Sequence, residues 1–351
     1  MPSIRLNKAF KVIKDVKAYV HLETGFTREA VPDPKKQIED QANKLRNAKK
    51  RVSRMRQTIR VKDREIARLK SLSEANGSSE GDHQDTPKNR RLISRPGAGS
   101  LPDFVIIGAQ KCGTSSLYSY LTGHPQVVSA SKKEVHFFDS PAFRRGEGWY
   151  RSNFPPQSSE NGQKTITGEA SPYYIYHPLV PKRAASLIPN AKLIALLRNP
   201  VDRAYSDYNH RVNDGIETLS FEEAIEAEAE RIKGEKERML SEEGYFSPNH
   251  RRYSYLARGV YVDQLEDWHE HFDRDQLLLL KSEDFFKDTR KMMGVVCDFL
   301  GLPEWEGGNF GQGRNRRRYE PMKPETRARL ERYFEPHNQR LYDYLGRDFG
   351  W

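Results

Sequence analysis

A lysine between two glycines, followed by a row of hydroxyl residues, is the first group of side chains with clear chemical potential. The loop 108–113 follows the apolar run 104–107, and three hydroxyl residues then open a predicted helix. Such a loop directs several backbone N–H groups toward one spot, with the positive end of the helix dipole behind them. We therefore predict an anion site, most often a phosphate site. The candidate residues in it are Lys111, Cys112, Gly113, Thr114, Ser115 and Ser116.

A second positive group stands at the end of another apolar run. Residues 192–197 are KLIALL, Arg198 follows directly, and Pro200 lies in the first turn of the next predicted helix. Ser206 is about two turns into that helix, on the face that can look back toward the end of the strand. An arginine and a hydroxyl that converge on one point suit a phosphate. The structural alternative is an ion pair between Arg198 and Asp202.

The glycine spacing also fits an NTP-dependent P-loop kinase, whose pattern is GxxxxGK[ST]. Gly108 and Gly113 have that spacing, but Thr114 stands where the pattern requires lysine. Such enzymes also need an aspartate at the end of a second apolar strand to hold magnesium. Arg198 occupies that position here, and an arginine would repel the metal and bind an anion in a bidentate manner. The residues therefore favour a polyanionic nucleotide bound without a metal ion, with the kinase as the alternative.

Four blocks of sequence occur in the order typical of one enzyme family. The first is PDFVIIGAQKCGTSSLYSYLTGHPQV, and the second is KKEVHFFD at 132–139. The third combines GEASPYYIYHP with KLIALLRNPVDRAYSDYNH, and the fourth combines RGVYVDQLEDW at 258–268 with the arginine run NRRRYEP at 315–321. Together they resemble the sulfotransferases that use 3′-phosphoadenosine 5′-phosphosulfate (PAPS). The resemblance covers about 102–351 and is strongest to the heparan-sulfate branch, the N-deacetylase/N-sulfotransferases and 3-O-sulfotransferases.

The resemblance implies that the sulfuryl group of PAPS passes to an acceptor hydroxyl or amine in one in-line displacement. Lys111 would stabilise the charge that develops on the leaving phosphate. Arg198 and Ser206 would bind the 3′-phosphate, and Arg258 and Tyr261 would approach the cofactor or the acceptor. The family also has a basic loop that closes on the 3′-phosphate and adenine. The matching positions are Arg316, Arg317 and Arg318, with Arg317 where glycine is usual.

The acceptor must lose a proton as it attacks sulfur, and the second block supplies two candidates for the general base. In the heparan-sulfate branch the glutamate of such a motif takes this role, whereas in the small-molecule branch a histidine does. We therefore favour Glu134 as the base and keep His136 as the alternative. Strand-like alternation would put both side chains on the same side. The structural alternative for His136 is a buried imidazole beside Phe137 and Phe138.

The acceptor is expected to be a saccharide or glycoconjugate. The motif set resembles the heparan-sulfate branch, and aromatic residues lie in the candidate acceptor segments. These residues are Trp149, Tyr150, Tyr173 and Tyr174. One departure from the branch is Ala170 after Glu169, where a lysine is common, and Lys132 and Lys133 could supply the missing cation.

The elements that must position these residues alternate between apolar strands and helical patterns. The predicted strands are 104–108, 192–197 and 276–280, and the largest predicted helices are 114–121, 180–187, 200–213, 221–240 and 260–271. This alternation predicts an α/β fold with a P-loop-like parallel sheet flanked by helices. Ligands bind at the carboxyl ends of the strands in such sheets, which is where the loop 108–113 lies.

The chain divides into four predicted segments. They are a weakly patterned N-terminal segment (1–34), a basic coiled-coil helix (35–72), a flexible linker (73–101) and a sulfotransferase-like domain (102–351). The coiled coil is predicted from apolar residues at every seventh position, namely Ile38, Leu45, Val52, Ile59 and Ile66. We expect a homo-oligomer formed through 35–72. The alternative is a single helix that packs on its own domain or is stabilised by charge alone.

The basic charge of the chain is concentrated in this helix. The net charge is +10, and 35–70 carries 14 Lys and Arg against 4 Asp and Glu, which accounts for all of it. No aromatic residue interleaves these charges, so we expect no nucleic-acid partner. A scaffold or nucleic-acid-binding protein built on the coiled coil is the alternative from a different class.

The cysteines and the N-terminus bear on the compartment. Cys112 and Cys297 form neither a disulfide framework nor a metal cluster, and they fit a reducing compartment. Residues 1–20 contain no unbroken apolar run, so we expect neither a signal peptide nor a transmembrane segment. These features predict a cytoplasmic protein without a metal cofactor.

The coiled coil is expected to set the oligomeric state. The full-length chain should form a larger assembly than a shortened chain that begins at residue 100, because the shortened chain lacks the apolar seam. Size-exclusion chromatography with light scattering measures both masses. An equal number of subunits in the two assemblies would show that the seam does not drive association.

Overall fold

The computed structural model describes residues 99–156, 159–160, 163–305, 310 and 319–351. The predicted segments 1–34 and 35–72, nearly all of 73–101, and the arginines Arg316, Arg317 and Arg318 lie outside these residues. The predictions made for them, including the coiled coil, therefore stay predictions.

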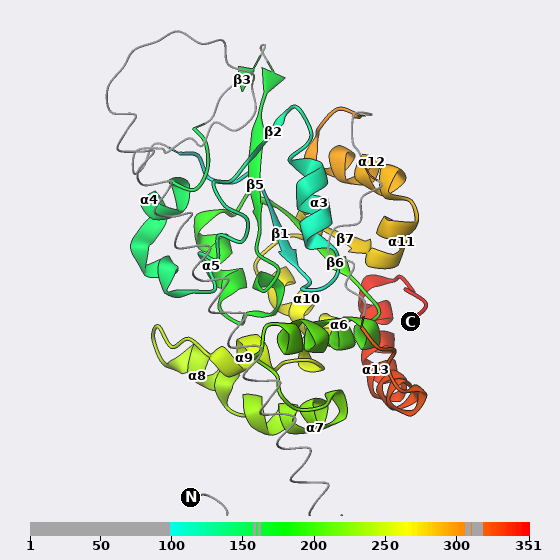
Figure 1. Cartoon of the computed structure of the whole chain (residues 1–351). Helices are drawn as coiled ribbons and strands as arrows, with labels where there is room; N and C mark the ends of the chain where they lie inside the picture. The colour runs from blue at the N-terminus through cyan, green and yellow to red at the C-terminus, as the bar shows by residue number, and fades with distance from the viewer. Residues whose placement is uncertain (1–98, 157–158, 161–162, 306–309, 311–318) are drawn as a thin grey trace, which may run out of the picture. The chain divides into compact units, whose positions relative to one another are not determined.

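A five-stranded parallel sheet forms the centre of the described domain (Figure 1). The strand order is β2-β5-β1-β6-β7, with β1 in the middle, and every pairing is parallel. The strands are β1 (Phe104–Gly108), β2 (Val127–Ser129), β5 (Ile166–Ala170), β6 (Lys192–Leu197) and β7 (Leu277–Lys281). A short antiparallel hairpin of β3 (Ser159–Glu160) and β4 (Gln163–Lys164) lies outside this sheet. The predicted α/β class and parallel sheet are confirmed.

The central strands form where the apolar run is uninterrupted. All of β1 is buried, as is β6 beyond Lys192, which is what a parallel strand covered on both faces requires. Both match their predicted ranges. The third predicted strand begins one residue later, because Gln276 belongs to a 3₁₀ turn with a capping box at Asp273. β2 is only three residues long and β5 mixes apolar with polar residues, so neither is among the three predicted strands.

The helices follow their predicted ranges with two corrections. The predicted helix 221–240 is two helices, because Gly234 takes a φ of 72° between them. The predicted helix 260–271 is shorter at both ends. The helices are α3 (Thr114–Leu121), α4 (Gly146–Arg151), α5 (Val180–Leu187), α6 (Pro200–Asn213), α7 (Phe221–Ile232), α8 (Glu235–Ser241), α9 (Pro248–Arg252), α10 (Tyr261–His269), α11 (Ser282–Lys287), α12 (Thr289–Leu300) and α13 (Pro324–Leu345).

The helices α6 to α9 gather near the end of the sheet where β1 and β6 finish (Figure 1). α6 is started by Asn199, whose side chain accepts the Val201 and Asp202 N–H groups, with Pro200 in the first turn. α10 is anchored to the sheet side by Trp268, which is fully buried and donates its indole N–H to the Ile175 carbonyl at 3.2 Å.

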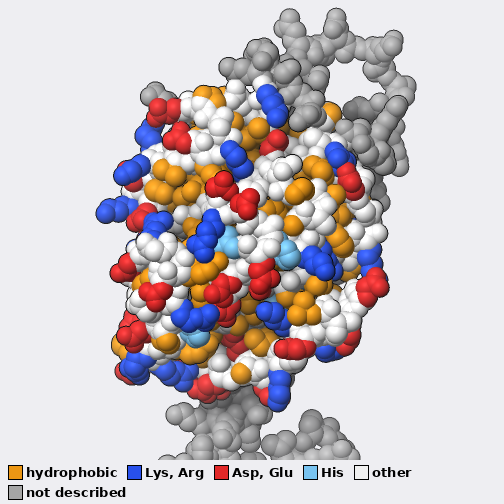
Figure 2. Space-filling view, turned by 180° about the vertical axis from the view of Figure 1, so that it is seen from behind, with side chains coloured by type: hydrophobic (Ala, Val, Ile, Leu, Met, Phe, Trp, Pro, Cys, Tyr) orange, Lys and Arg blue, Asp and Glu red, His pale blue; other side chains and the backbone are white. Residues whose placement is uncertain are grey.

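The surface of the described domain mixes charges of both signs. Figure 2 shows Lys and Arg side chains interspersed with Asp and Glu over the whole face in view. The face therefore presents no broad field of one sign, in keeping with the near-neutral sum of the sequence outside 35–70. No helix in the described part of the chain has the length and apolar character needed to cross a membrane.

Candidate active site

The loop 108–113 joins the end of β1 to the start of α3 and needs both of its glycines. A Cβ at Gly108 would come within 2.3 Å of Cγ2 of Ile175, so the backbone passes closer than a larger residue allows. Gly113 has a φ of 104°, in the region that favours glycine. Lys111 between them also has a positive φ, 73°. The chain is thus bent into the tight turn that an anion loop requires.

Hydrogen bonds connect the loop to β6 and to the residue that follows β7. Ala109 donates its N–H to the Leu196 carbonyl of β6 at 2.8 Å. Ser282, just after β7, donates its hydroxyl to the Cys112 carbonyl at 2.8 Å. The Cys112 thiol is buried 3.9 Å from the Tyr261 hydroxyl, and burial raises its pKa to about 11. Any part that Cys112 takes in the predicted anion site therefore belongs to its backbone.

The first turn of α3 supplies backbone donors at the end of the loop. Gly113 is the N-cap, and its carbonyl accepts the N–H groups of Ser116 at 2.9 Å and Leu117 at 3.1 Å. The N–H groups before them therefore have no acceptor inside the helix. Thr114 and Ser116 bury their side chains, while Ser115 is partly exposed. The helix start thus has the backbone geometry that the sequence predicted.

Arg198 lies beside this loop. Its Nη1 donates to the Lys111 carbonyl at 3.3 Å, and the buried Tyr261 donates its hydroxyl to the Arg198 carbonyl at 2.9 Å. Tyr261 thus fixes the backbone at the end of β6. Within the described residues Asp202 forms its ion pair with Arg327, so the structural alternative for Arg198 is not what the structure shows.

A buried charge cluster on α6 and its neighbours supports the loop from behind. Asp207 lies 3.4 Å from Arg203, 3.5 Å from Arg211 and 3.7 Å from Arg258. Although burial opposes it, these arginines lower the pKa of Asp207. Arg258 and Arg211 also donate to the Gln110 amide oxygen in the loop. Three arginines around one aspartate leave excess positive charge next to the loop.

Lys111 and Arg198, two of the predicted phosphate ligands, lie together at this edge of the sheet. The charge of Lys111 contributes to the lowered pKa of Asp207 and, after burial, to that of His210, so Lys111 lies on the α6 side of the loop. Ser206 is partly exposed in the second turn of α6. The carboxyl ends of β1 and β6 thus bring Lys111 and Arg198 together, while the place of Ser206 at the anion stays a prediction.

The segment that carries the two candidate bases is not a strand, and the predicted alternation is wrong. Glu134 and His136 have left-handed φ values of 60° and 52°. Side chains from the end of β5 and beyond capture the N–H groups of this segment and prevent a sheet ladder. The bonds run from Val135 N–H to Glu169 (3.3 Å), from His136 N–H to Ser171 (3.1 Å) and from Phe137 N–H to the Tyr174 hydroxyl (2.8 Å).

Glu134 and His136 nevertheless contact each other. His136 Nε2 lies 3.0 Å from Glu134 Oε2, and Lys133 lies 2.8 Å from Glu134 Oε1. Burial opposes the shift, but hydrogen bonds from His136 and Lys133 lower the pKa of Glu134 to about 2. His136 is only partly buried and has polar partners, so it is not the apolar imidazole of the structural alternative.

Two further residues at His136 were not identified from the sequence. The buried Asp139 places Oδ2 2.7 Å from His136 Nδ1, and Arg251 of α9 places Nη2 3.0 Å from His136 Nε2. Against burial and Arg251, Asp139 and Glu134 raise the pKa of His136 to about 9. The spacing of three residues in His136–Asp139 was a usable signal. Arg251 is 115 residues away in sequence, and no local pattern points to it.

Glu169 is the buried centre of the acceptor side. Its carboxylate accepts the hydroxyls of Ser171 (2.7 Å), Tyr150 (2.8 Å) and Tyr174 (3.1 Å). It is fully buried, and burial raises its pKa. Since it also accepts the Val135 N–H, Glu169 holds the segment with both candidate bases.

The predicted aromatic acceptor lining is wrong for three residues. Tyr150, Tyr173 and Tyr174 are buried, so their rings belong to the core rather than to an acceptor surface. Trp149 is partly exposed, with Arg145 4.7 Å and Lys132 5.3 Å from the centre of its ring. Trp149 therefore remains as the aromatic residue of this set that can meet an acceptor.

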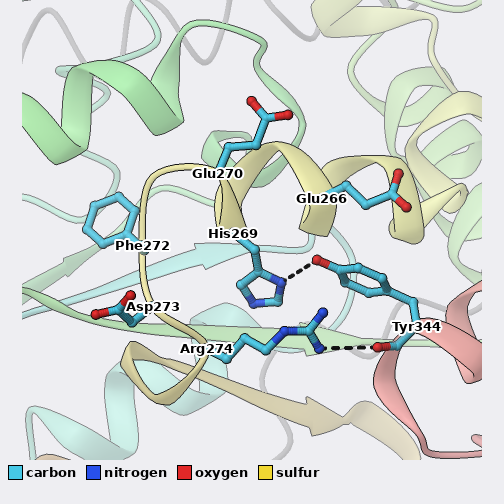
Figure 3. Close-up of a pocket in the computed structure, with 7 residues that line it drawn as sticks. All are labelled: Glu266, His269, Glu270, Phe272, Asp273, Arg274 and Tyr344. Carbon is cyan, nitrogen blue, oxygen red and sulfur yellow. Dashed lines mark hydrogen bonds between the residues drawn. The ribbon is translucent and has the colours of Figure 1, made fainter.

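A hollow of about 550 Å³ lies elsewhere, where α10 leads into β7 (Figure 3). It contains Glu266, His269, Glu270, Asp273 and Arg274, together with Phe272 and Tyr344. Three of its lining residues pair with one another, since His269 Nδ1 lies 2.8 Å from the Tyr344 hydroxyl and Arg274 donates to the Tyr344 carbonyl. Because it borders the start of β7, it is at the opposite edge of the sheet from the candidate site.

The sulfotransferase domain family has a model that matches residues 101–340. The chain belongs to this family. This sulfotransferase domain confirms the resemblance seen in the four sequence blocks. In the described residues no three His, Cys, Asp or Glu side chains gather in a way that could hold a metal ion.

Several sulfotransferases are similar to this chain in sequence. The membrane-associated sulfotransferase kil1 of Dictyostelium discoideum is 30% identical over 316 residues, covering 72% of this chain and 66% of the relative. The human heparan sulfate glucosamine 3-O-sulfotransferase 6 is 31% identical, covering 74% of this chain and 76% of the relative. The human bifunctional heparan sulfate N-deacetylase/N-sulfotransferase 3 is 33% identical, but this chain spans only 31% of its length.

A solved structure is similar in fold as well as in sequence. The crystal structure of a sulfotransferase from Alicyclobacillus acidocaldarius is 33% identical, with a TM-score of 0.58. The match covers 71% of this chain and 98% of that one.

Glu169→Ala should lower the free energy of unfolding by about 3 kcal/mol, because two buried tyrosine hydroxyls would lose their acceptor. Glu169→Gln keeps an oxygen acceptor and should cost about 1 kcal/mol. Urea unfolding measures both. Glu147→Ala, on the exposed face of α4, is the control and should stay within about 0.5 kcal/mol of the unchanged protein. Equal stability of all three variants would contradict the role given to Glu169.

Proposed function

We propose that this chain transfers the sulfuryl group of PAPS to a hydroxyl or amine of a saccharide or glycoconjugate. The observation that carries the proposal is the position of two groups at one edge of the sheet. Lys111 and Arg198 lie on the side of β6, and Glu134 and His136 lie on the side of β5. Family membership supports the transfer, and the names of two relatives, which refer to heparan sulfate, support a saccharide.

The donor carries anionic groups at both ends of its ribose. The loop 108–113 and the start of α3 bind the 5′-phosphosulfate, and Arg198 with Ser206 binds the 3′-phosphate. Arg316, Arg317 and Arg318 are assigned to the nucleotide by the sequence resemblance alone, because they lie outside the described residues. The excess positive charge around Asp207 supports this assignment, because it stabilises an anion held in the loop.

The transfer is one displacement at sulfur. The acceptor oxygen or nitrogen attacks, a new bond to sulfur forms, and the bond from sulfur to the 5′-phosphate oxygen breaks. Lys111 stabilises the negative charge on the departing 3′,5′-bisphosphate, and the acceptor proton passes to Glu134. Glu134 rather than His136 is assigned as the base. The Glu134 side chain is 39% exposed and can meet an acceptor, whereas both nitrogens of His136 are engaged, one by Glu134 and the other by Asp139.

Trp149 supports a saccharide acceptor. Its partly exposed ring, with Lys132 and Arg145 against it, offers an apolar face for a sugar and cations for anionic substituents. The comparisons do not favour the two rival functions, a kinase and a coiled-coil scaffold that binds nucleic acid. The homo-oligomer through 35–72 and the cytoplasmic location rest on the sequence alone and are part of the proposal.

Lys111→Ala should reduce sulfuryl transfer by about 100- to 1,000-fold, because it removes the charge that stabilises the leaving group. Transfer of radioactive sulfate from PAPS to desulfated heparan sulfate, in the presence of a chelator, measures the rate. Lys182→Ala, an exposed lysine on α5, is the matched control and should keep full activity. Full transfer by Lys111→Ala, or turnover of ATP that depends on magnesium, would contradict the proposed function.

A further inference from the structure

One nitrogen of His136, Nε2, contacts two groups that require opposite protonation states of it. Nδ1 is 2.7 Å from Asp139 Oδ2, so it carries a proton and donates it to that carboxylate. Nε2 is 3.0 Å from Glu134 Oε2 and also 3.0 Å from Arg251 Nη2. A hydrogen bond to the Glu134 carboxylate requires a proton on Nε2. A hydrogen bond from the Arg251 guanidinium, which can only donate, requires a free lone pair on Nε2. The two contacts of Nε2 are therefore alternatives.

The backbone of Arg251 is held by the same two arginines that bind the anion loop. Its carbonyl accepts hydrogen bonds from Arg211, at 3.2 Å, and from Arg258. Both of these arginines also donate to Gln110 in the loop 108–113. The Arg251 side chain is 27% exposed and lies 5.3 Å from the centre of the Tyr173 ring. The guanidinium thus reaches His136 from a backbone position held by the donor side of the site.

We propose that Arg251 is a positioning residue that makes loss of the His136 Nε2 proton easier and so leaves Glu134 better able to accept a proton. The inference rests on the proposed function in one respect, the role of Glu134 as the base. Arg251 acts through His136 and is not itself assigned a contact with the reacting atoms.

The physical argument concerns the basicity of Glu134. When His136 carries two protons, it donates to Glu134, and together with Lys133 it holds the pKa of Glu134 near 2, where a carboxylate is a poor base. When Nε2 accepts from Arg251 instead, Glu134 loses that donor and becomes more basic. Arg251 therefore favours the state that the reaction needs.

The carboxylates around His136 favour its protonated form. A cation beside the imidazole is therefore needed to make the loss of that proton easier. The ionisable groups that face the cluster are Lys133, Glu134 and Asp139 from its own segment, Glu169 from β5, His177 just before α5, Arg183 from α5, and Arg251 from α9. Burial lowers the pKa of His177 to about 4, so it is neutral near pH 7. Among these groups Arg251 is the cation within hydrogen-bond distance of the imidazole.

Arg251→Ala should raise the pKa of His136 by about one unit, because a cation next to the imidazole is lost. Nuclear magnetic resonance titration of the full chain with labelled histidine measures this, and the signal is identified by its loss in His136→Gln. Arg251→Lys keeps the charge and should keep most of the original pKa. Arg252→Ala removes an exposed arginine from the same helix and should change nothing. An unchanged or lower pKa of His136 in Arg251→Ala would overturn the proposal.

The kinetic consequence is tested with the same variants. In Arg251→Ala the acidic limb of the kcat profile should move to higher pH by about the same unit, and kcat at pH 7 should fall about tenfold. KM for PAPS should not change, because Arg251 is not assigned a contact with the donor. A raised His136 pKa with an unmoved kcat profile would also overturn the proposal. The histidine titration needs no substrate, so failure of the proposed sulfuryl transfer would be recognised separately.

Discussion

The parallel pairing of β1 with a strand on each side is the constraint on which the rest of the structure depends. Ile106 is in register with Ala170 of β5, and Gly108 is in register with Ala195 of β6. Because the three strands run in the same direction, the segments that follow them leave the sheet at the same edge. The anion loop, the Glu169 side-chain network and Arg198 are therefore neighbours, although they are far apart in the sequence.

The two halves of this edge carry opposite charge. On the side of β6 and α6, three arginines share one buried aspartate, so the loop rests on excess positive charge. On the side of β5, the carboxylates of Glu134, Asp139 and Glu169 lie close together. Arg258 and Arg251 connect the halves, since one reaches Gln110 and the other reaches His136. The excess positive charge beside the loop can thus hold an anionic donor next to a carboxylate that accepts a proton.

The sequence predicted best what depends on local pattern. The strands 104–108 and 192–197 are uninterrupted apolar runs. Arg198 was found because it directly follows the second run, and Lys111 because it lies shortly after the first. Glu134 and His136 were found by motif, but their predicted strand geometry was wrong, because the N–H groups of their segment bind side chains of Glu169, Ser171 and Tyr174 rather than the backbone of a strand. Arg251 depends on a tertiary contact that no local pattern encodes, whereas Asp139, three residues after His136, could have been found from its spacing. Tyr150, Tyr173 and Tyr174 were assigned to the acceptor lining because local sequence does not show burial, which tertiary contacts with Glu169 and His250 determine.

The central claim is that the site binds a nucleotide with two separate anionic ends and needs no metal ion. Calorimetric titration of the full chain with 3′-phosphoadenosine 5′-phosphate in a chelator tests it most directly, with adenosine 5′-phosphate as the comparison. The bisphosphate should bind about 10- to 100-fold more tightly than the monophosphate, and Arg198→Ala should abolish the difference. Equal affinity for the two nucleotides, or binding that appears only with magnesium, would contradict the account.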